Sequence, residues 1–454
     1  MTKMRRLSVF LILLSAAISI LIGVSLYQKS EAGAINYRAI YYGSRCLLQH
    51  ADPYNPNEFL RVYRADGGLF PTEPSKLQWF LRAVPICVNL PTTLFLITPL
   101  ALLPWGLALS FWWILLAASL IAAAFLSWDL SADYAPGVSL FLICILLANS
   151  QVLFTTGNTA GMAVGLCVIA AWCFLKRRLA VIGVLCLALS LAIKPHDSAL
   201  AWLYFLLAGG ALRKRALQAL AVMVLLCLPA LLWTSSVAPG WARELHANIV
   251  ETSSHGDISD PGPASIARKG TADVIIDLQS VISVFRDDPR IYNPLTYAIC
   301  GSMFLMWGIA IFRSRLSTTT SLYALAVIAP LSMLATYHRP YDAKLLLLSV
   351  PACCILWAEG GAIGRWAFAL TAAAVTLTGD IPLAMLAMIT RNLDESSMGG
   401  PGRTLTIAFF RPAPLALLAM TVFYLWVFLR SASRPTPVSH PTISEHASAA
   451  PSSP

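Results

Sequence analysis

Short polar clusters interrupt a very apolar sequence, and they hold the side chains best suited to chemistry. The clusters are 155–158 (TTGN), 194–197 (KPHD), 336–344 (TYHRPYDAK) and the long polar segment 36–70. An ionisable group within an apolar span costs about 2.5–3.5 kcal/mol, so such a group is usually tied to a site or a partner. From the three shorter clusters we predict these substrate-binding residues: Asn158, Lys194, His196, Asp197, His338, Arg339 and Lys344.

The segment 36–70 is the first long polar stretch, and it lies between two apolar blocks. Lys and Arg side chains can hold a phosphate, and a carboxylate can take a proton from an incoming hydroxyl. These groups together suit transfer of a sugar from a lipid phosphate. We predict Asp52 or Asp66 as the catalytic base, and the following substrate-binding residues: Asn36, Tyr41, Tyr42, Arg45 and Tyr54.

Each cluster also has a simpler structural interpretation. Lys194 could reach lipid headgroups while Asp197 caps the next helix. Gly157 and Asn158 could form only a turn, and Asp52, followed by Pro, could start another. Because four polar clusters are expected on one face of one bundle, we favour a shared site over four separate explanations.

Several function classes lack their sequence signatures. The chain contains no P-loop, no GxGxxG before a helix and no HExxH, so nucleotide hydrolysis, a dinucleotide cofactor and a zinc protease are unsupported. The net charge of +10 comes from short basic clusters at the ends of apolar runs, which is typical of membrane topology and not of nucleic-acid binding. His255, Asp257 and Asp260 could hold a metal, but a mixed polar loop is usually just solvated. We therefore predict no cofactor and no metal.

The composition indicates an all-α, polytopic membrane bundle. Hydrophobic residues make up 57% of the chain and charged residues 12%, with a mean hydropathy of +0.70. The run 7–27 follows a basic N-terminus and is expected to be an uncleaved first helix whose basic end is cytoplasmic. With all basic clusters inside, we predict about 12 spans (range 11–13), among them 105–128, 158–175, 179–195, 197–211 and 318–336. Extracytoplasmic loops are then expected at 28–86 and 236–293, with a shorter one at 391–411.

The region 87–149 contains three apolar stretches, but only two crossings fit the orientation. We expect 87–104, which four prolines bracket and break, to be re-entrant or interfacial; the alternative is that 136–149 is re-entrant. Residues 1–430 are predicted to form one membrane domain, and 431–454 a disordered cytoplasmic tail. Eight cysteines lie in apolar runs, and Cys46 and Cys87 near the first loop are expected to be free thiols rather than a disulfide.

The order of several motifs resembles glycosyltransferase family 87, also known as the domain of unknown function 2029 group, of the GT-C superfamily. The motifs are YYGSRCLLQHADPYNP after a first span, PLALLPWG, a GN turn, a span ending in a basic cluster, and LAIKP, and the resemblance covers roughly 1–350. It implies a polyprenyl-phosphate-mannose-dependent, generally inverting mannosyltransferase of the extracytoplasmic face. The implied partners are the lipid-linked sugar donor, a lipid or glycan acceptor and membrane lipids, in a multi-pass protein of a bacterial plasma membrane.

One residue departs from the family pattern. The resemblance implies an acidic general base shortly before the paired tyrosines, and the corresponding residue here is Asn36, whose amide cannot take a proton. Either the base has moved to Asp52 or Asp66, or the chain has kept the fold without catalysis. A transporter or flippase, in which the buried charges line a pathway, is the alternative from another class. The absence of an internal repeat in the sequence favours the transferase.

Overall fold

A computed structural model describes residues 3–31, 33–266, 275–314, 317–390, 402 and 410–432, and the regular secondary structure within these ranges is helical. The predicted tail and most of the predicted 391–411 loop lie outside the described residues. The first helices are α1 (Lys3–Lys29), α2 (Ile35–Leu48), α3 (Pro56–Ala65), α4 (Pro74–Ala83), α5 (Pro91–Ala101), α6 (Trp105–Ser131), α7 (Pro136–Ala148) and α8 (Gln151–Thr156). The middle helices are α9 (Ala160–Leu175), α10 (Ala180–Ile193), α11 (Pro195–Ala208), α12 (Gly210–Val237), α13 (Trp241–Thr252), α14 (Leu278–Phe285) and α15 (Pro289–Arg313). The last are α16 (Thr318–Ala335), the 3₁₀ helix η2 (Pro340–Leu348), α17 (Val350–Glu359), α18 (Gly361–Leu377), α19 (Asp380–Thr390) and α21 (Pro412–Ala432).

Proline and glycine set many of the helix boundaries. Helices α5, α7, α11 and α15 each begin at a proline. Proline costs no hydrogen bond there, because the first N–H groups of a helix have no partner within it. Gly209 (φ 82°) separates α11 from α12, and Gly360 (φ 79°) separates α17 from α18. These are backbone conformations that residues with a side chain rarely adopt. Local breaks therefore divide the apolar sequence into helices of unequal length.

Within the described residues, seven helices are long and apolar enough to cross a membrane, or nine if each of two bent pairs is one span. The bent pairs are Pro340–Leu348 with Val350–Glu359 (48°) and Gly361–Leu377 with Asp380–Ile389 (65°). Three segments predicted as spans are the shorter helices α9, α10 and α11, of 16, 14 and 14 residues. At 1.5 Å per residue these reach about 21–24 Å, less than a hydrocarbon core of about 30 Å. The polytopic helical bundle is confirmed, with fewer full-length spans than the 12 expected.

The helix lengths within 87–149 agree with the expectation that 87–104 is re-entrant or interfacial. Helix α5 has 11 residues and is too short to span, whereas Pro136–Thr156 gives a 21-residue apolar segment that can. Pro99 lies inside α5, as expected for a proline-interrupted stretch. The re-entrant or interfacial assignment of 87–104 therefore fits the helix lengths.

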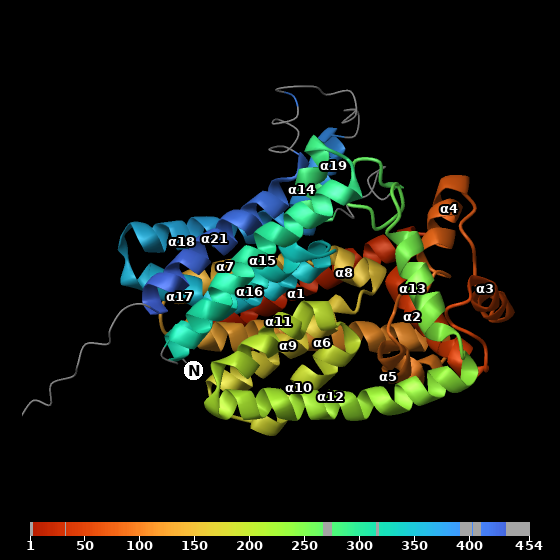
Figure 1. The fold of residues 1–454 in the computed structure, drawn as a ribbon, viewed down its shortest axis with the longest axis horizontal. Helices are drawn as coiled ribbons and strands as arrows, with labels where there is room; N and C mark the ends of the chain where they lie inside the picture. Colours follow the sequence, from red (N-terminus) through yellow and green to blue (C-terminus); the bar gives the residue numbers. More distant parts are fainter. Residues whose placement is uncertain are drawn as a thin grey trace, which may run out of the picture.

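Helix α16 is the central span of the bundle. In the most apolar part of α16, 78% of the residues are buried, compared with 17% in α12, which runs along the lower edge in Figure 1. The end of α16 leads directly into the 336–339 turn and then into η2, nearly all of which is buried. The TYHRPYDAK cluster thus enters the protein interior from the end of its most buried helix.

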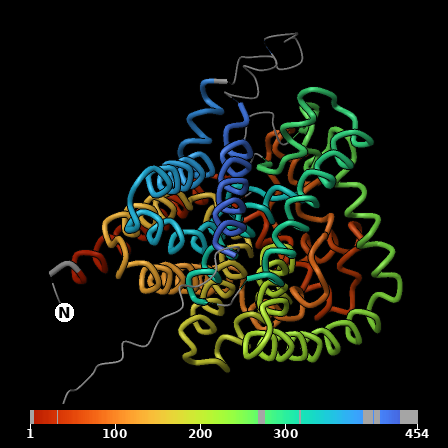
Figure 2. The backbone as a smooth tube through the Cα atoms, turned by 60° about the vertical axis from the view of Figure 1, so that its left-hand side comes forward, coloured from red at the N-terminus to blue at the C-terminus, as the bar shows by residue number. Residues whose placement is uncertain are grey.

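The two long polar regions predicted as loops pack together at one end of the molecule. Figure 1 shows α13 beside α2 and α4, and in Figure 2 the same red-orange and green parts of the chain meet on the right. The Arg82 guanidinium pairs with the Glu251 carboxylate at 2.6 Å. Asn248 Nδ2 donates to the carbonyls of Tyr54 and Cys87, both at 3.0 Å. Their contact agrees with the prediction that both regions lie on one side.

All ten cysteines lie in the described residues and all are free. Cys46 and Cys87 are both buried and form no bridge, so the expectation of free thiols is confirmed. Burial raises the pKa of the Cys87 thiol to about 11, which keeps it protonated and unreactive at neutral pH.

The Gly157 turn is a place where the backbone requires glycine. Gly157 has φ 64°, and a Cβ added there would lie 2.7 Å from Tyr37 Cβ. We expect Gly157→Ala to lower stability by about 1–3 kcal/mol, because a strained left-handed residue and a steric clash are added together. The thermal unfolding midpoint in detergent measures this. Gly106→Ala is the control, since a Cβ there has no neighbour within 4 Å; equal midpoints for both variants would contradict the prediction.

Candidate active site

Lys194 lies at the junction between α10 and α11, where the helical hydrogen-bond ladder is interrupted. Pro195 has no N–H to offer to the last turn of α10. Thr92 Oγ1 instead donates to the Ala192 carbonyl (2.6 Å), and Thr93 Oγ1 to the Ile193 carbonyl (2.8 Å). The first turn of α5 therefore satisfies the exposed carbonyls and fixes the backbone immediately before Lys194.

A buried ionic network surrounds the Lys194 ammonium. Its Nζ contacts a carboxylate oxygen of Asp342 and lies 3.3 Å from Asp197 Oδ2. The side chains of Asp197 and Asp342 are 1% and 2% exposed, and that of Lys194 is 12% exposed. Removing such charges from water costs several kcal/mol per ion, about as much as their mutual attraction returns. A network that gains so little stability is a candidate for function.

The turn after α16 supplies the other half of the network. Asp342 Oδ2 accepts a hydrogen bond from the Arg339 backbone N–H (2.8 Å), which leaves its other oxygen for Lys194. His338 Nε2 lies 3.4 Å from Asp197 Oδ1, and His196 Nε2 lies 3.8 Å from the same oxygen. The two predicted clusters, which are about 140 residues apart in the sequence, thus form one site.

His338 is completely buried, and its surroundings determine its orientation. Its Nδ1 bonds to the Thr336 carbonyl at 2.9 Å, and its own carbonyl accepts from Ile276 N–H at 2.9 Å. Burial lowers the pKa of the imidazole, but the nearby carboxylates of Asp197 and Asp342 outweigh that effect and the pKa is raised overall. The site therefore favours a positively charged group at this position.

Arg339 connects the network to the segment that follows α13. Its Nη2 donates to the Ile258 carbonyl at 2.7 Å, and its Nε donates to the Tyr337 hydroxyl. The guanidinium also lies over the Tyr337 ring, 5.3 Å from the centroid. The predicted 236–293 loop is therefore joined directly to the buried cluster.

Two predicted binding residues lie apart from this network. Lys344 Nζ donates to the Asn149 carbonyl at 2.6 Å, and Asn158 Oδ1 accepts from Ala160 N–H at 2.8 Å. Lys344 thus holds the end of α7, and Asn158 forms a turn just before α9. These contacts supply the structural role that the simpler interpretation gave to Asn158.

The predicted first-loop residues are mainly packed into helices. Tyr41 Oη donates to the Leu103 carbonyl (2.8 Å), and Tyr54 Oη donates to the Asn89 carbonyl (2.9 Å). The Tyr42 ring stacks on Trp105 with centroids 6.0 Å apart. Asn36 is half-buried in the first turn of α2. The aromatic residues fix the position of α2 relative to α5 and α6, and Asn36 remains partly accessible.

The two candidate bases have different surroundings. Asp66 forms a two-pronged pair with Arg45, at 2.7 and 2.8 Å. Asp52 Oδ1 accepts from Tyr54 N–H at 2.8 Å, as in the turn that the simpler interpretation expected. Glu244 lies beside Asp52, and its pKa is raised, first by a hydrogen bond with Asp52 and then by burial. Asp52 therefore lies beside a second carboxyl group, that of Glu244, whereas Asp66 pairs with an arginine.

We expect Glu244→Gln to raise stability at pH 7, by less than about 1 kcal/mol because the pair is partly exposed. A raised carboxyl pKa means that the folded protein binds this proton more tightly than the unfolded chain does. The stabilisation is therefore complete at low pH and is lost as the pH rises through the folded pKa, while glutamine stays uncharged throughout. Thermal midpoints in detergent near pH 7 and pH 4.5 measure this. Glu73→Gln, which removes an exposed pair with Lys76, should give no gain at pH 7.

Asp342 is a functional candidate that the sequence analysis did not single out. It is 1% exposed and contacts Lys194, and Tyr341 beside it lies under the same ammonium, with Nζ 5.1 Å from the ring centroid. Both residues are within the TYHRPYDAK cluster. The available signal was a carboxylate within an apolar stretch, next to a predicted phosphate-binding basic pair.

A second group of histidine and acids lies after α13. The structure brings His255 to Asp260 (3.3 Å) and Asp287 (3.8 Å), whereas Asp257 pairs with Arg82 at 3.3 Å. The sequence suggested Asp257 in place of Asp287. Asp260 already accepts hydrogen bonds from Gly256 N–H, Gly262 N–H and the Tyr292 hydroxyl, at 2.7, 2.9 and 3.2 Å. This group therefore has a structural role in shaping the loop.

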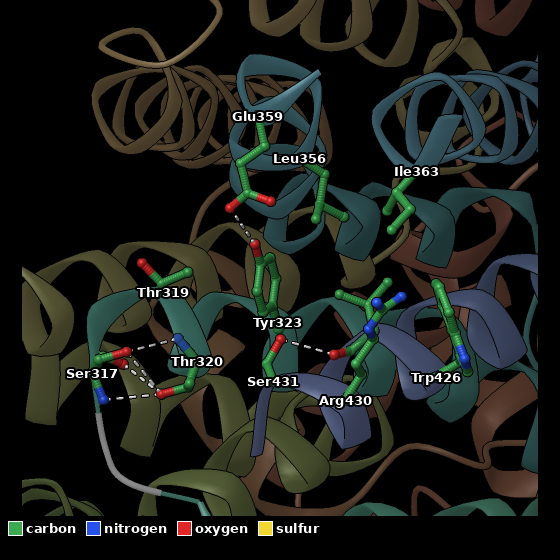
Figure 3. Close-up of a pocket in the computed structure, with 11 residues that line it drawn as sticks. Ser317, Thr319, Thr320, Tyr323, Leu356, Glu359, Ile363, Trp426, Arg430 and Ser431 are labelled. Atoms are coloured by element: carbon green, nitrogen blue, oxygen red, sulfur yellow. Dashed lines mark hydrogen bonds between the residues drawn. The ribbon is translucent and has the colours of Figure 1, made fainter. Parts of the chain in front are cut away.

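A pocket of about 240 Å³ lies far from the buried network, between the first turns of α16 and the end of α21 (Figure 3). Tyr323 donates to Glu359 across it (3.4 Å), and Trp426 and Arg430 line another wall. The 18 residues of α16 place about 27 Å between this pocket and the 336–339 turn. None of the predicted site residues lines it, so the buried network remains the candidate active site.

Comparison with known proteins identifies the family. Neither curated proteins nor solved structures gave a match. The model of glycosyltransferase family 87 matches residues 89–337, which is more than half of the 454 residues. The match includes the Lys194 junction and ends immediately before His338, and the first-loop acids precede it. The chain therefore belongs to glycosyltransferase family 87 and is a polytopic membrane glycosyltransferase.

Proposed function

We propose that the protein transfers a hexose, in particular mannose, from a polyprenyl-phosphate sugar to a lipid or glycan acceptor at the extracytoplasmic face of a bacterial plasma membrane. The main support is the buried network in which Lys194 contacts Asp197 and Asp342, and Asp197 faces His338, just beyond the end of α16. Family membership supports glycosyl transfer. A lipid-linked donor suits a site formed by helix ends within an apolar bundle.

The basic residues of the site match the charge that develops during this reaction. The bond between the sugar C1 and the phosphate oxygen breaks, and its electron pair stays on that oxygen. The phosphodiester, with one negative charge, thereby becomes a monoester with two. Lys194 and Arg339 are proposed to bind the phosphate, one as a point charge and the other through a planar fork. Their hydrogen bonds would strengthen as the leaving group gains charge, which is how such donors accelerate a reaction.

The acceptor hydroxyl must lose a proton as its oxygen bonds to C1 from the opposite face. We propose Asp52 as the base in preference to Asp66, because the Arg45 guanidinium occupies both oxygens of the Asp66 carboxylate, at 2.7 and 2.8 Å. Asp52 is linked to the Lys194 junction through α5: Tyr54 Oη donates to the Asn89 carbonyl, just before α5, and α5 holds the end of α10. Asn36, half-buried in the first turn of α2, would bind a sugar hydroxyl.

The proposed orientation places the basic clusters inside and the α2–α4 and α13 regions outside. Twelve crossings would then consist of the nine apolar spans together with α9, α10 and α11, each of which would cross a locally thinned bilayer. Residues 1–430 would form a single domain with the site near its extracytoplasmic end.

Sugar transfer in reconstituted vesicles tests the proposal. Purified protein, radiolabelled polyprenyl-phosphate mannose and a native lipid extract containing acceptors should yield labelled product, and the glucose analogue should yield less. If wild-type protein transferred sugar from neither donor, the proposed transferase activity would be contradicted. Movement of labelled donor across the vesicle membrane without transfer would instead support the flippase.

A further inference from the structure

Two imidazoles and one carboxylate converge beside Lys194, and they are arranged like metal ligands. The Nε2 atoms of His338 and His196 lie 3.4 and 3.8 Å from Asp197 Oδ1, and the ligand atoms of all three side chains lie within 4.8 Å of one another. We propose that His196, Asp197 and His338 bind a divalent transition metal of the Zn²⁺ class, with a fourth coordination position open. This departs from the sequence-based expectation of no metal.

The separations suit tetrahedral coordination. Zinc bonds to nitrogen and oxygen of about 2.0–2.2 Å place neighbouring ligand atoms about 3.3–3.6 Å apart in a tetrahedron. The two measured separations lie at or slightly beyond this range, so small side-chain movements would complete the site. The imidazole rings are nearly perpendicular, with centroids 5.1 Å apart and an interplanar angle of 73°, and both direct Nε2 to the same oxygen.

The His338 ring is held through Nδ1, the nitrogen that would not bind the metal. His338 uses Nδ1 for the Thr336 carbonyl (2.9 Å), the outer interaction that typically orients a metal-binding histidine through its other nitrogen. His338 Nε2 and Asp197 Oδ1 are buried and face each other at 3.4 Å, and Asp197 Oδ2 lies 3.3 Å from Lys194 Nζ. A metal ion between His338 Nε2 and Asp197 Oδ1 would replace their long contact with two coordinate bonds.

The charges of the network also admit a cation. Lys194 Nζ lies 3.3 Å from Asp197 Oδ2, on the opposite oxygen from the imidazoles, and Asp342 contacts the same ammonium. With His196 and His338 neutral, as metal-binding imidazoles are, Lys194, Asp197 and Asp342 together carry one negative charge. A divalent ion would make the site singly positive, which complements a phosphodiester bound at the open position. Imidazole and carboxylate ligands with one open position are typical of catalytic zinc.

This role for the metal rests on the proposed function, but its binding can be measured without any transfer assay. Detergent-purified protein is stripped with a chelator, loaded with Zn²⁺, freed of excess metal and analysed by elemental mass spectrometry. We expect about one tightly held zinc per chain in the wild type. His196→Ala should lose it, and because the His196 side chain is 42% exposed, this change should not prevent folding. Asp197→Asn should also lose it.

Two histidine variants outside the site are the controls. His246→Ala, on an exposed part of α13, should retain the metal. His255→Ala tests the other histidine and acid group, and it should retain the metal as well. Retention by His196→Ala, or loss only in His255→Ala, would overturn the proposal. Zinc binding without sugar transfer would contradict the proposed function alone, and transfer by zinc-free protein at the full wild-type rate would overturn the metal's role.

Discussion

Lys194→Met is expected to lower the turnover number for sugar transfer by at least about a hundredfold, the effect of removing one well-placed donor to a developing negative charge. The methionine fills a similar volume but carries no charge, so the phosphate would lose the cation nearest to Asp197 and Asp342. Transfer from polyprenyl-phosphate mannose in vesicles measures the effect. Activity within threefold of the wild type would contradict a role in leaving-group binding.

The single variant could also unfold, because it leaves Asp342 buried without its partner, at a cost of about 3–5 kcal/mol. The double variant Lys194→Met with Asp342→Asn separates the two causes. It removes both charges, so the thermal midpoint should recover towards that of the wild type while transfer stays low. Lys176→Met is the matched control: its ammonium forms an exposed 3.3 Å pair with Asp129, worth at most about 1 kcal/mol. Recovery of activity in the double variant would show that Lys194 acts only on stability.

The long helices could be predicted closely from hydropathy and basic ends. The predicted spans 105–128 and 318–336 correspond to Trp105–Ser131 and Thr318–Ala335, because each is a continuous apolar run with a polar or proline boundary. The short helices could not be predicted in the same way. The breaks at Gly157 and Pro195 are visible in the sequence, but they do not reveal how far the intervening helices extend through a bilayer.

The site could be predicted in part, for a related reason. Buried charge within apolar runs singled out Lys194, Asp197 and His338, and the structure brings these residues together. The pairing of Lys194 with Asp342 depends on how α10 and η2 meet in space, which no local pattern contains. Polarity alone was a poorer guide for Lys344, whose ammonium satisfies a helix-end carbonyl. Charge identified the candidates, and packing determined which of them share a site.

Asp52→Asn is expected to reduce transfer by about 10²–10⁴-fold, the usual contribution of a general base. The amide can keep the hydrogen bond from Tyr54 N–H, so the turn should persist while proton acceptance is lost. Asp66→Asn should reduce transfer by less than tenfold, since it weakens a partly exposed pair with Arg45 that is worth at most about 1 kcal/mol. Initial rates at saturating donor, with protein amounts matched by size-exclusion profile, compare the two variants.

Asp133→Asn controls for the substitution itself, because Asp133 is exposed in the turn between α6 and α7. A larger loss in Asp66→Asn than in Asp52→Asn would exchange their roles. If neither acid matters while Lys194 does, the proton must go elsewhere, and Asn36→Asp becomes decisive. A gain in rate from that change would mean that the native chain works slowly for want of a carboxylate in the first turn of α2. No gain would indicate that proton removal does not limit the reaction.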